Sequence, residues 1–109
     1  EEGEVIRIGP LVIDIDRFEA RVSGEPLRLS AVEFRFLALF AKHPGRVYSR
    51  AQLIERIWGF SADIDERTVD VHMLRLRKQL SGTEAADFIE TVRGLGYRAA
   101  ALKSSQANS

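Results

Sequence analysis

The sequence predicts an α+β domain in which short strands come first, three helices follow, and a β-hairpin ends the fold. Three observations support this order. Residues 5–29 alternate between short apolar runs and turn residues, which is typical of antiparallel strands. Residues 30–80 repeat apolar side chains at helical spacing, and two serines there start S-x-x-E/Q capping sequences. Residues 88–100 contain two apolar runs around a glycine-rich turn, a pattern that favours a hairpin.

Size and composition exclude several classes of protein. The chain has 109 residues, 16 basic and 16 acidic side chains, and no cysteine. This length suits one domain, and the lack of cysteine excludes disulfides and thiolate metal sites. No apolar run approaches the roughly 18 residues of a membrane span, and no secretory signal opens the chain. We therefore expect a cytoplasmic protein without membrane contact.

Charge is divided unevenly along the chain. Acidic residues outnumber basic ones by 12 to 9 over residues 1–66, whereas basic residues outnumber acidic ones by 7 to 4 over residues 67–109. The second half is therefore compatible with a polyanion site.

Four strands are expected before the first helix. They are Val5–Ile8, Leu11–Asp14, Glu19–Val22 and Leu27–Leu29. Their tight spacing favours an antiparallel meander. Residues 1–4 look like the end of an acidic linker, so we expect a linker remnant there and a partner domain before it. Residues 103–109 are polar and are expected to form a flexible tail, which leaves 5–102 as the folded domain.

Two helices start at capping boxes. Ser30 is followed three residues later by Glu33, and Ser49 by Gln52, so each pair satisfies free backbone amides in the first turn. Pro44 ends the first of these helices.

The third helix is expected from about Glu66 to Leu80, with Asp65 as its N-cap. At 100° per residue its apolar stripe faces the core. This stripe consists of Val69, Met73, Leu76 and Leu80. The opposite arc consists of Arg67, Val71, Leu74, Arg75 and Lys78, and His72 and Arg77 lie on the flanks.

Two interpretations of the opposite arc remain open from its residues alone. One is a solvated face that carries two stray aliphatic side chains. The other is a DNA-binding face, because a major groove presents thymine methyls to Val71 and Leu74 and paired guanine acceptors to an arginine. Phosphates along the groove attract Arg67, Lys78 and His72.

The hairpin is expected at Phe88–Val92 and Tyr97–Ala100, with Arg93 at its tip. An arginine there is suited to the negative potential of a minor groove. Thr91 and Tyr97 add hydroxyls suited to phosphate oxygens. Taken alone, the same segment also fits a structural hairpin with a polar rim.

Three long stretches carry a family resemblance. "LRLSAVEFRFLALFAKHPGRVYSRAQLIERIWG", "DERTVDVHMLRLRKQL" and "IETVRGLGYR" resemble the bacterial OmpR/PhoB-type response regulators, and most of all the PhoB-like branch. The resemblance implies a winged helix-turn-helix fold with an N-terminal four-stranded antiparallel sheet, three helices and a C-terminal β-hairpin wing. It also implies the effector domain of a two-component regulator of transcription.

The resemblance implies a set of DNA contacts. Phosphate contacts fall on Arg67, His72 and Lys78, base contacts on Val71 and Arg75, a further helix contact on Arg77, and wing contacts on Thr91, Arg93 and Tyr97. Trp58 matches a position that meets a phosphate through its indole N–H, although a helix-end aromatic also suits the core. Leu74 departs from the family pattern, in which a basic or polar residue is common, so its contact with DNA stays open.

Several partners follow from the same resemblance. We expect double-stranded promoter DNA with tandem direct repeats, bound by a tandem dimer, together with a receiver domain and a histidine kinase in the phosphorelay. The loop at residues 59–66 resembles a polymerase-contacting loop, through Phe60, Asp63, Asp65 and Glu66. For Asp65 and Glu66, a favourable interaction with the dipole of the following helix is the competing explanation.

Other function classes have less support. An enzyme needs a nucleophile–base pair or a metal cluster, yet His43 and His72 are expected on different helices. We expect no catalytic residue, no metal and no cofactor. A winged helix that binds protein instead of DNA remains the alternative, and the salt dependence of binding separates the two.

Overall fold

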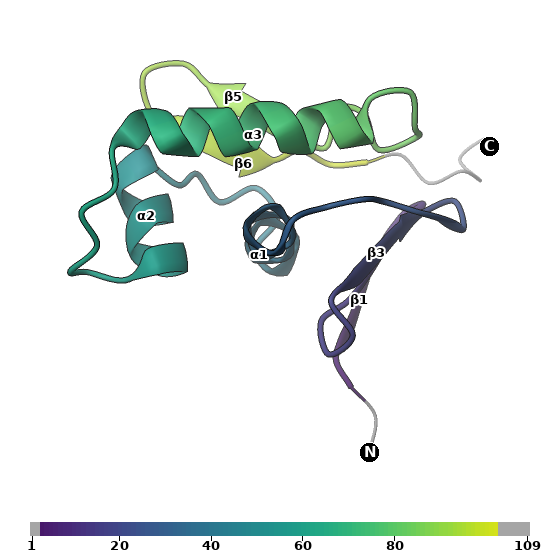
Figure 1. Ribbon diagram of the computed structural model, residues 1–109. Helices are drawn as coiled ribbons and strands as arrows, with labels where there is room; N and C mark the ends of the chain where they lie inside the picture. The colour runs from purple at the N-terminus through teal and green to yellow at the C-terminus, as the bar shows by residue number, and fades with distance from the viewer. Residues whose placement is uncertain (1–2, 103–109) are drawn as a thin grey trace.

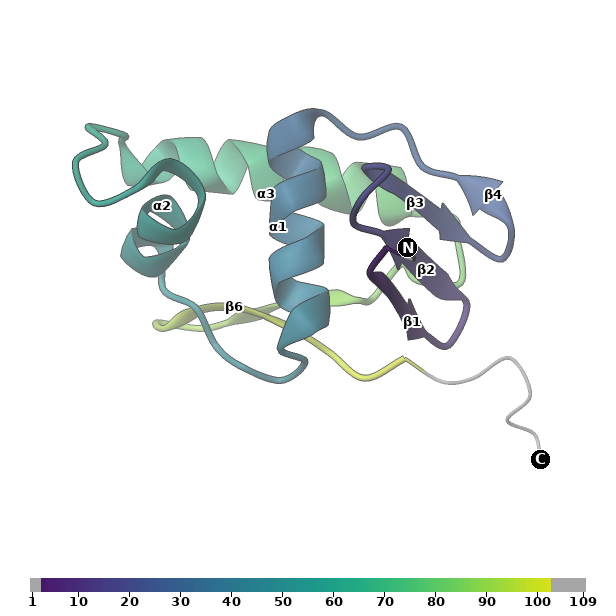
Figure 2. The same ribbon diagram turned by 90° about the horizontal axis from the view of Figure 1, so that it is seen from below.

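The computed structural model describes residues 3–102, so the expected tail at 103–109 and residues 1 and 2 lie outside the described part. The elements are β1 Val5–Ile8, β2 Leu11–Asp14, β3 Glu19–Val22, β4 Glu25–Pro26, α1 Ala31–Lys42, α2 Arg50–Trp58, α3 Glu66–Leu80, β5 Ile89–Val92 and β6 Gly96–Ala99. In Figure 1, α3 lies alongside the β5–β6 hairpin, and the N-terminal sheet stands at the opposite side of α1 from α2. Figure 2 shows α1 crossing in front of α3. The predicted fold class is confirmed.

The N-terminal sheet is an antiparallel meander in the order β1-β2-β3-β4. The first three strands have the predicted bounds, but the fourth prediction was wrong: the strand is Glu25–Pro26, not Leu27–Leu29. Leu27 donates its N–H to the Ala20 carbonyl at 2.9 Å. The chain beyond it then runs directly to the N-cap of α1. Pro26 is tolerated because β4 is an edge strand.

The predicted helix starts are confirmed. Ser30 and Glu33 form a reciprocal capping box on α1, and Ser49 and Gln52 form another on α2. Asp65 caps α3, since its side chain accepts a hydrogen bond from the Arg67 N–H at 2.9 Å. The acceptors at these N-termini therefore fix where each helix begins.

The inner stripe of α3 anchors that helix to the rest of the core. Its members are at most 1% exposed, and they are Val69, Met73, Leu76 and Leu80. They face α1 and α2, which both pack against α3. Because this stripe is buried, the opposite side of α3 is turned to solvent, as the helical spacing predicts.

The wing is joined to the link between α1 and α2. Tyr48 donates its N–H to the Tyr97 carbonyl at 2.9 Å, and Tyr97 returns the bond to the Tyr48 carbonyl at 3.0 Å. Gly96, with φ 148°, brings the backbones together, because a Cβ there would collide with the Tyr48 carbonyl oxygen. The base of the wing is thereby fixed against the segment that leads into α2.

Within residues 3–102, no helix has the length and apolar character needed to cross a bilayer.

Candidate nucleic-acid interface

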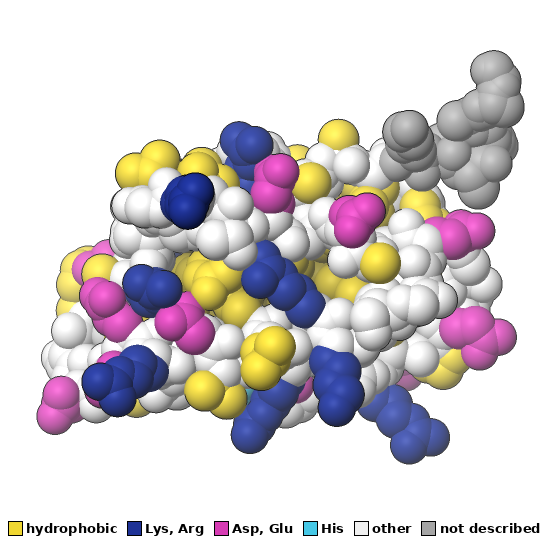
Figure 3. Space-filling view, turned by 90° about the horizontal axis from the view of Figure 1, so that it is seen from above, with side chains coloured by type: hydrophobic (Ala, Val, Ile, Leu, Met, Phe, Trp, Pro, Cys, Tyr) yellow, Lys and Arg dark blue, Asp and Glu magenta, His cyan; other side chains and the backbone are white. Residues whose placement is uncertain are grey.

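The outward face of α3 is formed by five exposed side chains: Arg67, Val71, Leu74, Arg75 and Lys78. Among residues 3–102, none of its three cations takes part in an ion pair. Val71 is 44% and Leu74 68% exposed, one helical turn apart. Figure 3 looks onto this side of the molecule and shows Lys and Arg side chains among apolar ones. Within residues 3–102, the face therefore combines cations without ion-pair partners and apolar groups that no other segment covers.

The wing tip presents a further cation beside this face. Arg93 is exposed and precedes Gly94, whose φ of 78° turns the chain. Arg93 forms no ion pair with any residue between 3 and 102. Leu95, next to the tip, is 63% exposed. The tip thus carries the same combination of a cation and an apolar side chain as the outward face of α3.

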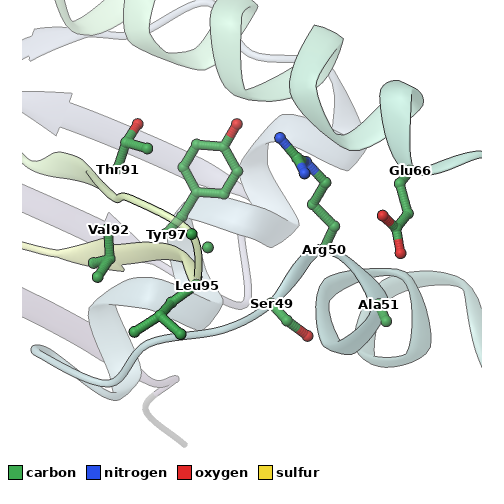
Figure 4. A pocket seen from close by; sticks show the side chains of 10 residues that line it. Ser49, Arg50, Ala51, Glu66, Thr91, Val92, Leu95 and Tyr97 are labelled. Carbon is green, nitrogen blue, oxygen red and sulfur yellow. The ribbon is translucent and has the colours of Figure 1, made fainter.

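A second group of polar side chains joins α2, α3 and the wing; we call it the seam. It comprises Arg50, Asp70, Arg77, Thr91 and Tyr97. The Tyr97 hydroxyl donates to Asp70 Oδ1 at 2.7 Å, and Arg50 Nε donates to the same oxygen at 2.8 Å. Figure 4 shows Arg50 and Tyr97 extending towards α3 from α2 and from the wing, at the edge of a hollow of about 280 Å³.

Arg77 completes the seam from the other end of α3. Its Nη2 donates to Thr91 Oγ1, at 2.6 Å, and its Nε donates to the Ile89 carbonyl at 3.3 Å. The guanidinium also lies 5.3 Å from the centre of the Tyr97 ring, a cation–π distance. Arg77 therefore contacts both strands of the wing.

The protonation states of the seam are set by these contacts. Burial raises the pKa of Asp70, but hydrogen bonds from Arg50 and Tyr97 outweigh burial and leave it lowered. Burial, followed by the bond to Asp70, raises the pKa of Tyr97. Asp70 is consequently an ionised acceptor at neutral pH, and the Tyr97 hydroxyl keeps the proton that it donates.

These contacts give two of the expected wing residues protein partners of their own. The sequence assigned the Tyr97 hydroxyl to a phosphate; in the structure this hydroxyl donates to Asp70, and the residue is 7% exposed. Thr91 is exposed, but its hydroxyl oxygen already accepts from Arg77. Arg50 was not among the site residues expected from the sequence. Arg50 and Asp70 have opposite charges and could have been considered as an ion pair from the sequence. They are 20 positions apart, however, and no helical or strand periodicity predicts a contact between residues so distant.

His72 lies in a separate corner between the three helices. Its Nδ1 is 3.0 Å from Glu33 Oε2, and its ring centre is 5.9 Å from that of Trp58 and 6.2 Å from that of Phe36. Burial raises the pKa of Glu33, but hydrogen bonds from His72 and Ser30 outweigh burial and leave it lowered. The corner therefore holds an ionised carboxylate against an imidazole. Trp58 is half-buried, with its ring at 75° to that of Phe36, so it is both a core contact and a partly accessible side chain.

The acidic loop between α2 and α3 is open to solvent at several positions. Phe60 is 86% exposed, and Asp63, Asp65 and Glu66 are exposed as well. Asp65 has a structural role as the N-cap of α3, and Glu66 lies in the first turn, where the helix dipole favours negative charge. Within the described part of the chain, Phe60 and Asp63 have no comparable structural role.

A comparison with models of protein families identifies the family of this chain. The model described as "Transcriptional regulatory protein, C terminal" matches residues 24–99, from β4 through the wing. The chain belongs to this family. The match spans all three helices and both strands of the wing, and the family consists of regulators of transcription, not of enzymes.

Curated relatives are regulators from several bacteria. Heme response regulator HssR of Staphylococcus saprophyticus is 46% identical over 93 residues, which are 85% of this chain and 42% of that protein. Phosphate regulon transcriptional regulatory protein PhoB of Escherichia coli is 43% identical over 95 residues, which are 87% of this chain and 42% of that protein. The chain thus spans less than half the length of these relatives. The expected resemblance to the OmpR/PhoB type is confirmed.

Solved structures agree with the family. The DNA-binding domain of CpxR from E. coli matches with a TM-score of 0.77 at 31% identity, covering 91% of this chain and 98% of that one. The RstA DNA-binding domain from Klebsiella pneumoniae, solved with the RstA box, matches with a TM-score of 0.77 at 35% identity, covering 89% and 97%.

Proposed function

We propose that this domain binds double-stranded promoter DNA sequence-specifically, as the effector domain of a two-component response regulator. The main support comes from the outward face of α3. Its cations have no ion-pair partner among residues 3–102, and its apolar side chains are exposed. A helix of 15 residues is roughly 22 Å long and fits a major groove. With α3 in the major groove, the wing enters the neighbouring minor groove.

We propose for each residue of the outward face a contact with the DNA group that suits its side-chain chemistry. Arg75 presents a forked donor to a guanine edge, and Val71 packs on a thymine methyl. Arg67 and Lys78 neutralise phosphates, and Arg93 at the wing tip enters the minor groove. Leu74 has no polar atom in its side chain, so it contributes apolar contact only.

The seam and the His72 corner support these contacts. Thr91 accepts from Arg77 through its oxygen, so its own hydroxyl proton is available to a phosphate. Tyr97 and Arg77 hold the wing against α3, and any contact they make with DNA is additional to that role. Trp58 and His72 are assigned to phosphates through their ring nitrogens.

Selection of binding sites from random duplex DNA tests the proposal. We expect one sequence class to be enriched, with an affinity that falls steeply as salt rises, because phosphate binding releases counterions. Failure to enrich any sequence, or binding that is indifferent to salt, would support the alternative of a protein-binding module.

Further partners are proposed from the family. A receiver domain and a histidine kinase would control the domain, RNA polymerase would respond to it, and the site of action would be the cytoplasm. Two copies would bind tandem direct repeats with half-sites about one helical turn apart. Titration of duplexes with one and two half-sites tests pairing: equal affinity per half-site would exclude it.

The exposed part of the acidic loop is proposed as the polymerase contact. Phe60→Ala should lower activated transcription in a reconstituted system and leave DNA affinity unchanged, since Phe60 is 86% exposed and outside the DNA-binding face. Asp63→Asn gives a second variant of the same loop. Unchanged transcription from both variants would exclude this contact.

A further inference from the structure

Glu33 is the one buried charged residue in the described part of the chain, at 5% exposure. Its two carboxylate oxygens have different partners. Oε1 accepts the Ser30 backbone N–H at 3.2 Å within the capping box of α1, whereas Oε2 lies 3.0 Å from His72 Nδ1. Glu33 therefore links the first turn of α1 to the middle of α3.

The carboxylate determines which nitrogen of His72 carries a proton. The pKa of Glu33 is lowered, despite burial that raises it, by the bonds from His72 and Ser30, so the group is ionised and only accepts hydrogen bonds. His72 Nδ1 must therefore be the donor. In a neutral imidazole only one nitrogen is protonated, so Nε2 then has no proton.

His72 Nε2 has no hydrogen-bond partner among residues 3–102 and is not fully buried. Tyr48 Oη is the only buried side-chain nitrogen or oxygen in that part of the chain without a hydrogen-bond partner, so His72 Nε2 retains contact with solvent. The His72 side chain is 17% exposed.

We propose that Glu33 is a positioning residue that makes phosphate binding by His72 depend on a proton. A phosphate oxygen needs a donor, and Nε2 becomes one only when the ring is an imidazolium with both nitrogens protonated. The bound state then takes up one proton, so affinity is greatest at low pH and falls as pH rises. The inference rests on the proposed DNA-binding function.

Few other groups face the ring. Among the described contacts, α1 presents Glu33 and Phe36, and α2 presents the Trp58 ring without a charged group. On α3 itself, Arg75 follows His72 by three residues on the outward face. Glu33 is thus the charged group in direct contact with the imidazole.

Glu33→Gln provides a sharp test because it should reverse the tautomer. The capping box of α2 uses Gln52, whose Oε1 accepts the Ser49 N–H at 2.9 Å, so glutamine serves the same purpose at this position. With its oxygen on Ser30, the Gln amide would donate to His72 Nδ1. The neutral ring would then carry its proton on Nε2 and donate to phosphate without taking up a further proton.

The affinity for the selected duplex should be measured by fluorescence anisotropy between pH 5.5 and 8.5 at constant ionic strength. For wild type we expect Kd to rise by about threefold or more from pH 6 to pH 8, and by at most about tenfold per pH unit for one linked proton. His72→Gln and Glu33→Gln should both lose this dependence, and Glu33→Gln should bind more tightly than wild type at pH 8. His43→Gln is the matched control, since His43 caps the C-terminus of α1, and it should keep the wild-type slope.

A ¹⁵N NMR experiment on the histidine rings tests the same point without DNA. The neutral His72 ring should carry its proton on Nδ1 in wild type and on Nε2 in Glu33→Gln. If Glu33→Gln does not fold, the pH dependence of affinity in wild type, His72→Gln and His43→Gln still tests the proposal. Equal wild-type affinity at pH 6 and 8, a slope that persists in His72→Gln, or a wild-type Nε2 proton overturns this inference alone. Absence of binding at every pH overturns the proposed function itself.

Discussion

The outward face of α3 and the seam carry similar residues but differ in what those residues touch. On the outward face, Arg75 has no ion-pair partner among residues 3–102, and its neighbours there include exposed aliphatics. In the seam, two positions further along the same helix, Arg77 donates to Thr91 and to the Ile89 carbonyl.

This difference separates two roles, binding of a ligand and orientation of the wing relative to α3. A cation without a protein partner offers its full interaction to a ligand. A guanidinium already bound to both wing strands instead keeps the helix and the wing in one orientation, which a two-groove contact requires. Substitutions in the two regions should therefore fail in different ways.

The largest effect should distinguish the two sides of α3 itself. Leu80→Ala removes a fully buried side chain and should lower the free energy of unfolding by about 2–5 kcal/mol. Leu74→Ala is the matched control, because Leu74 is 68% exposed and its loss should change stability by about 0.5 kcal/mol or less. Chemical denaturation of both variants checks the pair, and equal losses would mean that α3 is rotated.

Arg75→Ala tests the ligand-directed side of the comparison. Loss of a forked contact to a guanine should weaken binding to the selected site by about 1–3 kcal/mol and should affect random DNA far less. Stability should stay unchanged, since Arg75 is exposed. Titration against selected and random duplexes measures both quantities, and equal losses on the two would make Arg75 a phosphate contact.

Tyr97→Phe tests the seam. It removes the hydroxyl that donates to Asp70 and should lower stability at pH 7 by about 1 kcal/mol, a small effect because the Asp70 side chain is 39% exposed. The pKa of Asp70 is lowered, despite burial that raises it, by Arg50 and Tyr97. Its stabilising contribution is therefore present above its unfolded pKa and lost as pH falls through the folded pKa, and the penalty of Tyr97→Phe should fade in acid.

The chain offers a matched control for that variant. Tyr48→Phe removes a buried hydroxyl that has no hydrogen-bond partner in the described residues, so stability should not fall. Thermal unfolding at pH 7 and at pH 3 compares the two substitutions. A loss for Tyr48→Phe as large as that for Tyr97→Phe would contradict the role given to the seam.

Val71→Ala should have the smallest effect. We expect stability within about 0.5 kcal/mol of wild type and a modest loss of affinity where a thymine methyl faces the helix. Replacing each thymine of the selected site with uracil removes only that methyl. If wild type tolerates every replacement equally, Val71 does not contact a thymine.

Local rules in the sequence predicted most of the fold. Capping sequences placed the starts of α1 and α2, and helical spacing identified the stripe that ends at Leu80. The fourth strand was misplaced because an apolar run at 27–29 looks like a strand, whereas the hydrogen bonds there end at Leu27 before the cap at Ser30.

The site was predicted less completely than the fold. Exposure on α3 follows from helical spacing, so Arg75 and Leu74 could be placed on the outward face from the sequence. The partners of His72 and Tyr97 could not, because Glu33 is 39 positions from His72 and Asp70 is 27 from Tyr97. Such pairs depend on how helices and strands distant in the sequence pack together, and no local periodicity in the sequence contains that information.

NMR chemical-shift mapping tests directly whether the outward face of α3 and the wing tip together form the DNA-binding surface. ¹⁵N-labelled domain should be titrated with the selected duplex, and backbone amide shifts followed residue by residue. We expect the largest changes at Val71, Arg75 and the wing tip around Arg93. Little change is expected at Phe18 and Leu39, which lie together in another hollow between the N-terminal sheet, α1 and α2. Large shifts in that hollow, with α3 and the wing tip silent, would contradict this expectation.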